Sequence, residues 1–530
     1  MSNMFEKRFA EIIPSDELQP KSGPTWYITH HSVYHKQKRK IRVVFNCSLK
    51  CNGVSLNDNL YQGPDLTSSL FGVLLRFRQH PIAVVADIQK MFYQVRVPKP
   101  HSDLLRFFWV DESAKIVECR LLVHVFGALS SPSVAQYALR ETVKRINDND
   151  VKNTVSKNFY VDDMLKSFRN ISDAIQQVPQ VIKVLQNGGF TLTAFNSNSP
   201  EISKITTVTS DPSPTIALAP EEDSTRTLGV TWNTKKDTLG YTIHLHTNET
   251  TTKRQLLMIL ASVYDPHGLA SPALMEGKIL FQESCRLKLD WEGVLPQDLQ
   301  NRWNKWVMSM NDLTEYSVQR CLTKSTTTAA KLELHTFADG SERAYGCVSY
   351  LKIFNKDLVT STALVASKSR LTPINNSTLK TVPRIELCAA KLAVELSQKL
   401  ETEFDFRIDC VFWSDSTTVL SYIKSESTRF LRFVSNKVNY IRAFSRPEDW
   451  NYVSTKENPA DIISRGCTAK QLTKSSLWNH GPAFLAEENY SPENVTLIID
   501  EKDTELKERT KVLTCTTNES PLDALVDSTS

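Results

Sequence analysis

Apolar residues along the first third of the chain predict a sheet with at least one helix beside it. Continuous apolar runs at residues 81–87 and 159–165 are typical of buried strands. Between them, a turn at residues 127–132 contains glycine and a Ser-Pro pair, and helical spacing then runs to about residue 146. Proline suits the first turn of a helix, so we expect this helix to begin near Pro132. The two apolar runs are expected to be neighbouring strands of one sheet.

Beyond residue 250 the spacing changes from helical to strand-like and back. Three helical stretches occupy residues 251–264, 273–288 and 295–310. Residues 332–337 alternate between apolar and polar positions as a strand does, and residues 344–351 are expected to pair with them in a hairpin. A long helix with one apolar stripe begins near residue 384. The pattern predicts a multidomain protein of the α/β and α+β classes.

Composition limits the class of protein further. The chain has 530 residues, 41% hydrophobic and 23% charged, which is ordinary for three or four soluble domains of about 150 residues each. No apolar run approaches the roughly 20 residues needed to cross a bilayer, so no membrane partner is expected. Ten cysteines without zinc-like spacing predict reduced thiols in an intracellular protein. The net charge is only +4, but residues 35–42 form a basic run that suits phosphate contact, a nuclear-localisation signal or a solvated loop.

The string Tyr160-Val161-Asp162-Asp163 is the strongest candidate for chemistry in the first half. Taken alone it is also compatible with a solvated turn. Asp87 ends the earlier apolar run, 75 residues before Asp162 (162 − 87), a spacing that suits adjacent strands. Side chains alternate along a strand, so Asp162 and Asp163 should not both face the core. Three neighbouring carboxylates repel unless cations neutralise them, which predicts a pair of Mg²⁺ ions able to activate a 3′-hydroxyl.

Four acids in the second half stand where strands end or helices begin. They are Asp339, Glu386, Asp415 and Asp461. Each has an ordinary alternative role, and Asp415 and Asp461 in particular could be helix N-caps. As a series, however, they predict a second acidic site at one edge of a sheet.

Ordered motifs in the first half resemble the reverse transcriptase of Pao/BEL-type LTR retrotransposons. The matching stretches are Arg42-Val43-Val44-Phe45, residues 53–58 and 63–66, Ala86-Asp87-Ile88 through Phe92, Phe126-Gly127 with Ser131-Pro132, Tyr160 to Asp163, residues 188–192, and residues 228–232. The resemblance implies a right-hand polymerase in which Asp87, Asp162 and Asp163 hold metal. It also implies that Arg42 contacts the incoming triphosphate and that Phe92 excludes a ribose 2′-hydroxyl. The turn at Phe126 and Gly127 would approach the nucleotide or template, because glycine lets a backbone come close.

The second half resembles the ribonuclease H domain of the same elements. The motifs are Phe337-Ala338-Asp339-Gly340-Ser341, Pro383-Arg384-Ile385-Glu386-Leu387, Trp413-Ser414-Asp415-Ser416 and the stretch from Asn458 to Gly466. By this resemblance Asp339, Glu386, Asp415 and Asp461 would hold two Mg²⁺ ions that activate water against RNA in an RNA–DNA hybrid.

The sequence departs from these families at three points. Asn46 replaces an acid, Ala194 replaces a basic residue, and no histidine lies between residues 416 and 460, where some relatives carry one. An inactive relic that only binds nucleic acid is therefore the alternative to an active enzyme. An aspartic peptidase, a label sometimes given to this family, is disfavoured because the chain contains no Asp-Thr-Gly or Asp-Ser-Gly.

Together these patterns predict four segments. We expect fingers and palm at residues 1–235, helical thumb or connection at 236–325, the ribonuclease H-like domain at 326–488, and a polar, disordered tail at 489–530. A Ser-, Thr- and Pro-rich stretch at 201–226 should be a surface loop. Expected partners are an RNA template, a DNA primer, RNA–DNA hybrid and dNTPs. The family implies protease and integrase regions flanking this one, and a cytoplasmic virus-like particle, with nuclear entry left open by the basic run.

Overall fold

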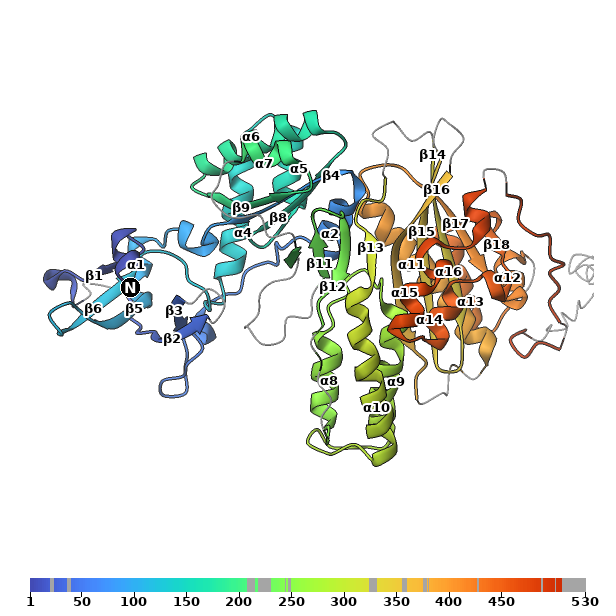
Figure 1. The fold of residues 1–530 in the computed structure, drawn as a ribbon. Coiled ribbons are helices and arrows are strands. Elements are labelled where there is room, and N and C mark those ends of the chain that lie inside the picture. The colour runs from blue at the N-terminus through green and yellow to red at the C-terminus, as the bar shows by residue number, and fades with distance from the viewer. Residues whose placement is uncertain are drawn as a thin grey trace, which may run out of the picture.

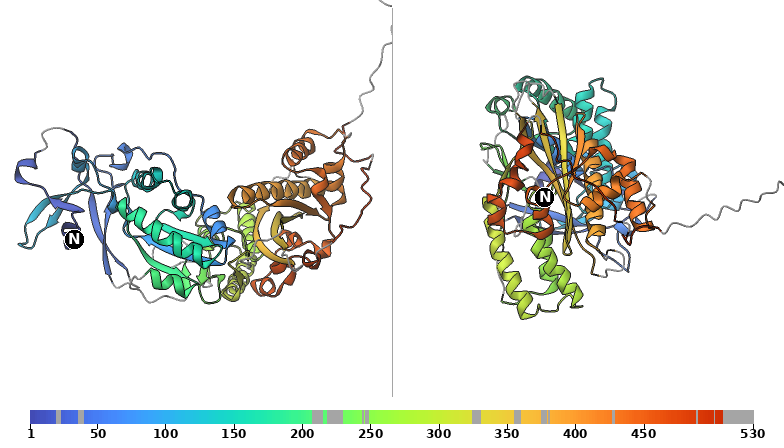
Figure 2. Two further views of the ribbon diagram at one scale, coloured as in Figure 1. Left: turned by 90° about the horizontal axis from the view of Figure 1, so that it is seen from above. Right: turned by 90° about the vertical axis from the view of Figure 1, so that its right-hand side faces the viewer.

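The domains lie one after another, from an N-terminal sheet domain to a C-terminal α/β domain (Figures 1 and 2). The computed structural model describes residues 1–19, 23–35, 40–206, 215–217, 230–243, 245, 249–323, 331–354, 360–374, 379, 381–426, 429–487, 490–500 and 502–507. We name the four parts after those that the sequence resemblance implies: fingers, palm, thumb and nuclease domain. In the described part of the chain, no helix is both long and apolar enough to span a membrane.

The fingers consist of small sheets around a compact apolar core. One sheet has the order β1 (Ala10–Ile12), β6 (Ile116–Leu121), β5 (Arg106–Val110), and the hairpin β2 (Thr29–His35)–β3 (Lys40–Asn46) forms another. Short helices α1 (Ser2–Glu6) and α3 (Lys99–Ser102) flank them. Phe45 and Phe107 meet in the core with ring centroids 5.2 Å apart. Half of the basic run that suits phosphate contact, residues 36–39, lies outside the described residues.

The palm is a four-stranded antiparallel sheet with helices α4–α7 packed against it (Figure 1). The strand order is β7 (Phe159–Tyr160), β8 (Asp163–Phe168), β4 (Ile82–Ile88), β9 (Leu192–Ser197). The palm helices are α2 (Leu70–Gln79), α4 (Ser131–Lys144), α5 (Asn149–Lys157), α6 (Ile171–Asn187) and α7 (Pro200–Ile205). Both apolar runs predicted as strands are neighbours, as expected. Residues 201–205 of the expected loop at 201–226 instead belong to α7. Of that loop only residues 201–206 and 215–217 lie within the described residues.

The thumb combines a small sheet with three helices. Its strands are β10 (Thr215–Ala217), β11 (Val230–Asn233), β12 (Thr238–Tyr241) and β13 (Ser317–Gln319), in that order. The helices α8 (Lys253–Ser262), α9 (Ser271–Arg286) and α10 (Gln297–Met310) match the three helical stretches predicted from spacing. Trp303 and Trp306 of α10 are buried, and the indole N–H of Trp306 donates to the Ala273 carbonyl of α9 (2.9 Å).

The nuclease domain has a five-stranded sheet between two layers of helices. The order is β16 (Thr360–Leu371), β15 (Ala344–Phe354), β14 (Lys331–Gly340), β17 (Asp409–Ser414), β18 (Trp450–Tyr452). The first three strands pair antiparallel, and β14, β17 and β18 run parallel. Helices α11 (Val382–Glu403), α12 (Thr417–Lys424) and α13 (Arg432–Phe444) share one core, while α14 (Ala460–Arg465), α15 (Ala469–Lys474) and α16 (Ser476–His480) pack on the other face.

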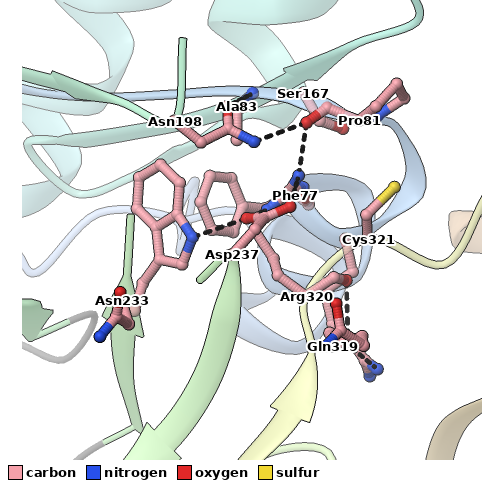
Figure 3. Close-up of polar contacts among 12 residues, drawn as sticks. Phe77, Pro81, Ala83, Ser167, Asn198, Asn233, Asp237, Gln319, Arg320 and Cys321 are labelled. Atoms are coloured by element: carbon pink, nitrogen blue, oxygen red, sulfur yellow. Dashed lines mark hydrogen bonds and ion pairs between the residues drawn. The ribbon is translucent and has the colours of Figure 1, made fainter. Parts of the chain in front are cut away.

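A buried pair of arginines joins palm, thumb and nuclease domain. Arg320, after β13, is fully buried, forms an ion pair with Asp237 (2.6 Å) and donates to carbonyls of residues 77, 80 and 81 (Figure 3). Arg78 at the end of α2 donates to the carbonyls of Leu364 and Val365 in β16, both at 2.6 Å. One apolar cluster also runs through all three parts. The polymerase-like and nuclease parts therefore meet in a packed interface.

The expectation of a disordered tail from residue 489 onward is wrong for residues 503–507. Leu506 pairs with Phe430 in an isolated β-bridge, and Glu505 is buried. Its charge is compensated by an ion pair with Arg384 (2.5 Å), which allows a polar segment to dock. Residues 508–530 lie outside the described residues.

Candidate active sites in the palm and the nuclease domain

The palm brings three predicted acids together at the end of β4. Asp87 lies directly opposite Asp163 in the antiparallel register of β4 and β8, so both side chains project from the same face. Asp162 precedes β8 in the hairpin turn, and its carbonyl accepts from the Ile88 N–H (2.8 Å). One carboxylate oxygen from each of the three acids lies within 4.8 Å of the other two. The turn interrupts strand alternation, which is why adjacent acids share one site.

The hairpin turn is strained and held from outside. Val161 has φ +54°, a left-handed conformation that is unfavourable for a β-branched residue. The side-chain amide of Gln136, buried on α4, donates to the Val161 carbonyl (2.9 Å). Such strain persists only where surrounding contacts impose it, and it is common at functional sites. Gln136 was not identified from the sequence, where it is one polar position within an amphipathic helix.

The palm acids suit a divalent cation. All three are partly buried, and burial raises the pKa of Asp162. Three partly buried carboxylates this close favour a hard cation with oxygen ligands.

Three of the four residues predicted to bind nucleotide lie together. The rings of Phe92 and Phe126 meet edge to face at 4.4 Å, with Phe92 buried and Phe126 half exposed. Gly127 has φ +96°, and a Cβ there would lie 3.0 Å from the Phe45 carbonyl of β3. Arg42 lies three residues earlier on the same strand, with an exposed side chain, and pairs in register with Val33.

Asn57 fixes the loop after Phe126. Its amide donates to the Gly127 carbonyl (2.9 Å) and its carbonyl oxygen accepts from the Leu129 N–H (3.0 Å). The sequence predicted a close backbone approach at Gly127 but assigned no role to Asn57.

The nuclease acids converge more loosely than the palm acids. Asp339 is the last residue but one of β14, and Asp415 follows β17. Because these strands are parallel neighbours, their ends meet at one edge. The Asn458 amide bridges the two strands, donating to the Ala338 carbonyl (3.1 Å) and to Asp415 Oδ1 (3.2 Å). All four acids are described, yet no three of them bring ligand atoms within 4.8 Å of one another.

Burial changes the protonation of these acids. It raises the pKa of Asp339 to about 6, and the nearby charges of Asp415 and Asp461 add to the effect. It raises the pKa of Glu386, near the start of α11, to about 7. Opposing hydrogen bonds come from Ser464 to Asp339 and from Ser416 to Glu386. Groups that resist ionisation because they are buried beside other carboxylates are suited to receive a cation.

Neither Asp415 nor Asp461 is a helix N-cap, the alternative role considered for both. The N-cap of α12 is Ser416, whose hydroxyl accepts from the Val419 N–H, so Asp415 is not the cap. Asp461 lies in the first turn of α14, while the Asn458 side chain accepts from the Ala460 N–H. Burial raises the pKa of Asp461 against an ion pair with Arg465 (2.7 Å). Asn458 and Ser464 thus support the acids, a role that their motif did not reveal.

The strand orders of the palm sheet and of the five-stranded sheet define the fold class. It is a right-hand polymerase fold of the reverse transcriptase type followed by a ribonuclease H-like domain. Residues 252–416 match the family model described as Pao retrotransposon-like RNaseH-like domain, which covers α8–α10 as well as the first four strands of the nuclease sheet. The match over residues 252–416 and the fold confirm the resemblance to a Pao/BEL-type retroelement polyprotein fragment.

Solved structures of the foamy viral protease–reverse transcriptase share the fold. One, a form designated dRH in complex with double-stranded DNA, has a TM-score of 0.54 at 13% identity, covering 86% of this chain and 68% of its own. Another, also with double-stranded DNA, has a TM-score of 0.52 at 14% identity, covering 86% and 81%. A search of curated proteins finds no significant match.

Proposed function

We propose that the chain is an RNA-directed DNA polymerase with ribonuclease H activity. It would extend a DNA primer on an RNA template with dNTPs and cleave the RNA of the resulting hybrid. The observation that carries the proposal is the meeting of Asp87, Asp162 and Asp163 within 4.8 Å at a strained hairpin. The double-stranded DNA in the foamy viral structures supports a duplex nucleic acid as the ligand.

In the palm, each residue has a task set by its position. Asp87 and Asp163 face the same side of the sheet, and Gln136 holds the turn that presents Asp162. A bound pair of Mg²⁺ ions would supply charge neutralisation and Lewis acidity at these carboxylates. Gly127 lets the loop after Phe126 lie against the Phe45 carbonyl of β3, and Phe92 packs edge to face on the half-exposed Phe126 ring, which would contact the nucleotide.

In the nuclease domain, Asp339, Glu386, Asp415 and Asp461 would hold the cations that activate water. Asn458 fixes the separation of the two central strand ends, and Ser464 orients Asp339. With no histidine between residues 416 and 460, Glu386 and Asp339 are the groups of this site with pKa values near neutrality. They would therefore exchange protons as the cations bind.

Primer extension on a poly(rA)–oligo(dT) duplex with Mg²⁺ tests the polymerase. The natural chain should extend the primer, and Asp162→Asn should not, while still binding the duplex. Cleavage of a labelled hybrid tests the nuclease with Asp339→Asn, which should leave extension intact. Duplex binding without extension or cleavage by the natural chain would refute the proposed enzyme and leave a binding relic.

A further inference from the structure

The tail of this chain places a carboxylate on an arginine at the start of helix α11. Glu505 receives two hydrogen bonds from Arg384, at 2.5 Å from Nε and 3.0 Å from Nη2. The two residues are 121 positions apart in sequence, and the Glu505 side chain is 5% exposed. The Arg384 guanidinium also lies over the Phe433 ring, 5.0 Å from its centroid. Two hydrogen bonds thus hold a carboxylate on the Arg384 guanidinium.

The site stands beside the nuclease acids but does not belong to them. Arg384 lies in the first turn of α11 and Glu386 follows two residues later, so the two side chains project from different sides of the helix. Arg384 faces α12 and α13, through Tyr422 and Phe433, whereas Glu386 interacts with Ser416, Asp415 and Asp339. Both side chains nevertheless start from the N-terminal end of one helix.

The occupant comes from an acidic stretch. Residues 500–505 contain four acids and one lysine. Within it, the Tyr422 hydroxyl donates to Asp503 (2.5 Å), and backbone bonds join residues 505 and 507 to residues 431 and 429. Figure 1 shows this last coloured segment running beside α12, on the side of the nuclease domain away from the palm. An acidic strap therefore lies across a positively charged group next to the candidate nuclease site.

We infer that Arg384 is a binding site for a backbone phosphate of the nucleic acid and that Glu505 occupies it as an internal mimic. The planar guanidinium binds carboxylate and phosphate in the same two-pronged geometry. Duplex nucleic acid would displace the strap and take over both hydrogen bonds, so the tail competes with substrate. This inference rests on the proposed nuclease function. It adds a phosphate contact at Arg384 and a tail that competes with nucleic acid for that contact.

The test compares full-length variants for binding to a blunt RNA–DNA hybrid, with Ca²⁺ replacing Mg²⁺. Fluorescence anisotropy at several KCl concentrations gives the affinity and its salt dependence. Glu505→Gln should bind about tenfold more tightly, the contribution typical of a charge-assisted contact. It should also steepen the plot of log affinity against log salt by about 0.9, one phosphate's worth. Glu493→Gln is the matched control, because it changes the same charge on an exposed tail residue and should bind as the natural chain does.

A double variant separates phosphate binding from simple removal of charge. Arg384→Gln combined with Glu505→Gln should lose both the tighter binding and the steeper slope. Asp503→Asn, which loosens the strap at Tyr422, should show a smaller gain than Glu505→Gln and serves if that variant folds poorly. Equal binding by Glu505→Gln and Glu493→Gln, or a gain that persists in the double variant, would overturn this inference alone. Failure of every form to bind the hybrid would overturn the proposed function, and this inference with it.

Discussion

Replacing Glu386 by glutamine should stabilise the metal-free nuclease domain at alkaline pH. Burial raises the pKa of this carboxyl from 4.5 to about 7, so the folded domain resists its ionisation. A group with a raised pKa in the folded state binds more protons there, and stability falls as pH rises from about 4.5 to 7. Above that range the shift in pKa lowers the free energy of unfolding by about 3 kcal/mol. Allowing for partial contact with solvent reduces this loss to about 2 kcal/mol. Glutamine keeps the shape and removes the ionisation.

Native-state hydrogen exchange in EDTA is the suitable assay, because a multidomain chain does not unfold in one step. Peptides covering β14 and α11 should be protected more in Glu386→Gln than in the natural chain at pH 8, with little difference near pH 4.5. Mg²⁺ should restore protection to the natural chain and have a smaller effect on the variant. Glu493→Gln should behave as the natural chain. An equal effect of Glu386→Gln at both pH values would refute the assigned pKa and the electrostatic reasoning.

Three further outcomes are expected. The apparent Mg²⁺ affinity of the nuclease site, followed by isothermal titration, should rise between pH 6 and pH 8, because the cation displaces protons from Asp339 and Glu386; a flat profile would contradict their raised pKa values. Gln136→Leu should lower the rate of primer extension about tenfold with nearly unchanged KM for dNTP, since only the support of the catalytic turn is lost; an unchanged rate would show that the turn holds itself. Arg320→Met should destabilise the junction of palm, thumb and nuclease by about 3–5 kcal/mol, measured by native-state hydrogen exchange of peptides covering α2 and β13, because Asp237 is left without its ion-pair partner; exposed Lys235→Met is the control.

Elements with strong local signals could be predicted from the sequence. The apolar runs ending at Asp87 and around Asp162 became neighbouring strands, and the three helical stretches after residue 250 became α8, α9 and α10. Burial periodicity is a local property, so it survives without knowledge of the rest of the fold. The motif order identified the family resemblance. Asp87 and the four acids of the second half were named from strand ends and helix starts, and Asp162 and Asp163 from the string Tyr160 to Asp163.

Contacts between distant residues needed the tertiary structure. The strained φ of Val161 cancelled the expected alternation of Asp162 and Asp163, and the support from Gln136 is invisible in a helix pattern. The burial that raises the pKa of Glu386 comes from elements far apart in sequence. The composition of the tail predicted disorder, yet Glu505 docks because it pairs with Arg384, 121 residues earlier in the sequence. Sequence alone determined which side chains were available and which local elements carry them. Only the packed fold decided which charged groups meet and how far each is removed from water. Desolvation and pairing depend on neighbours in space, which the sequence does not give.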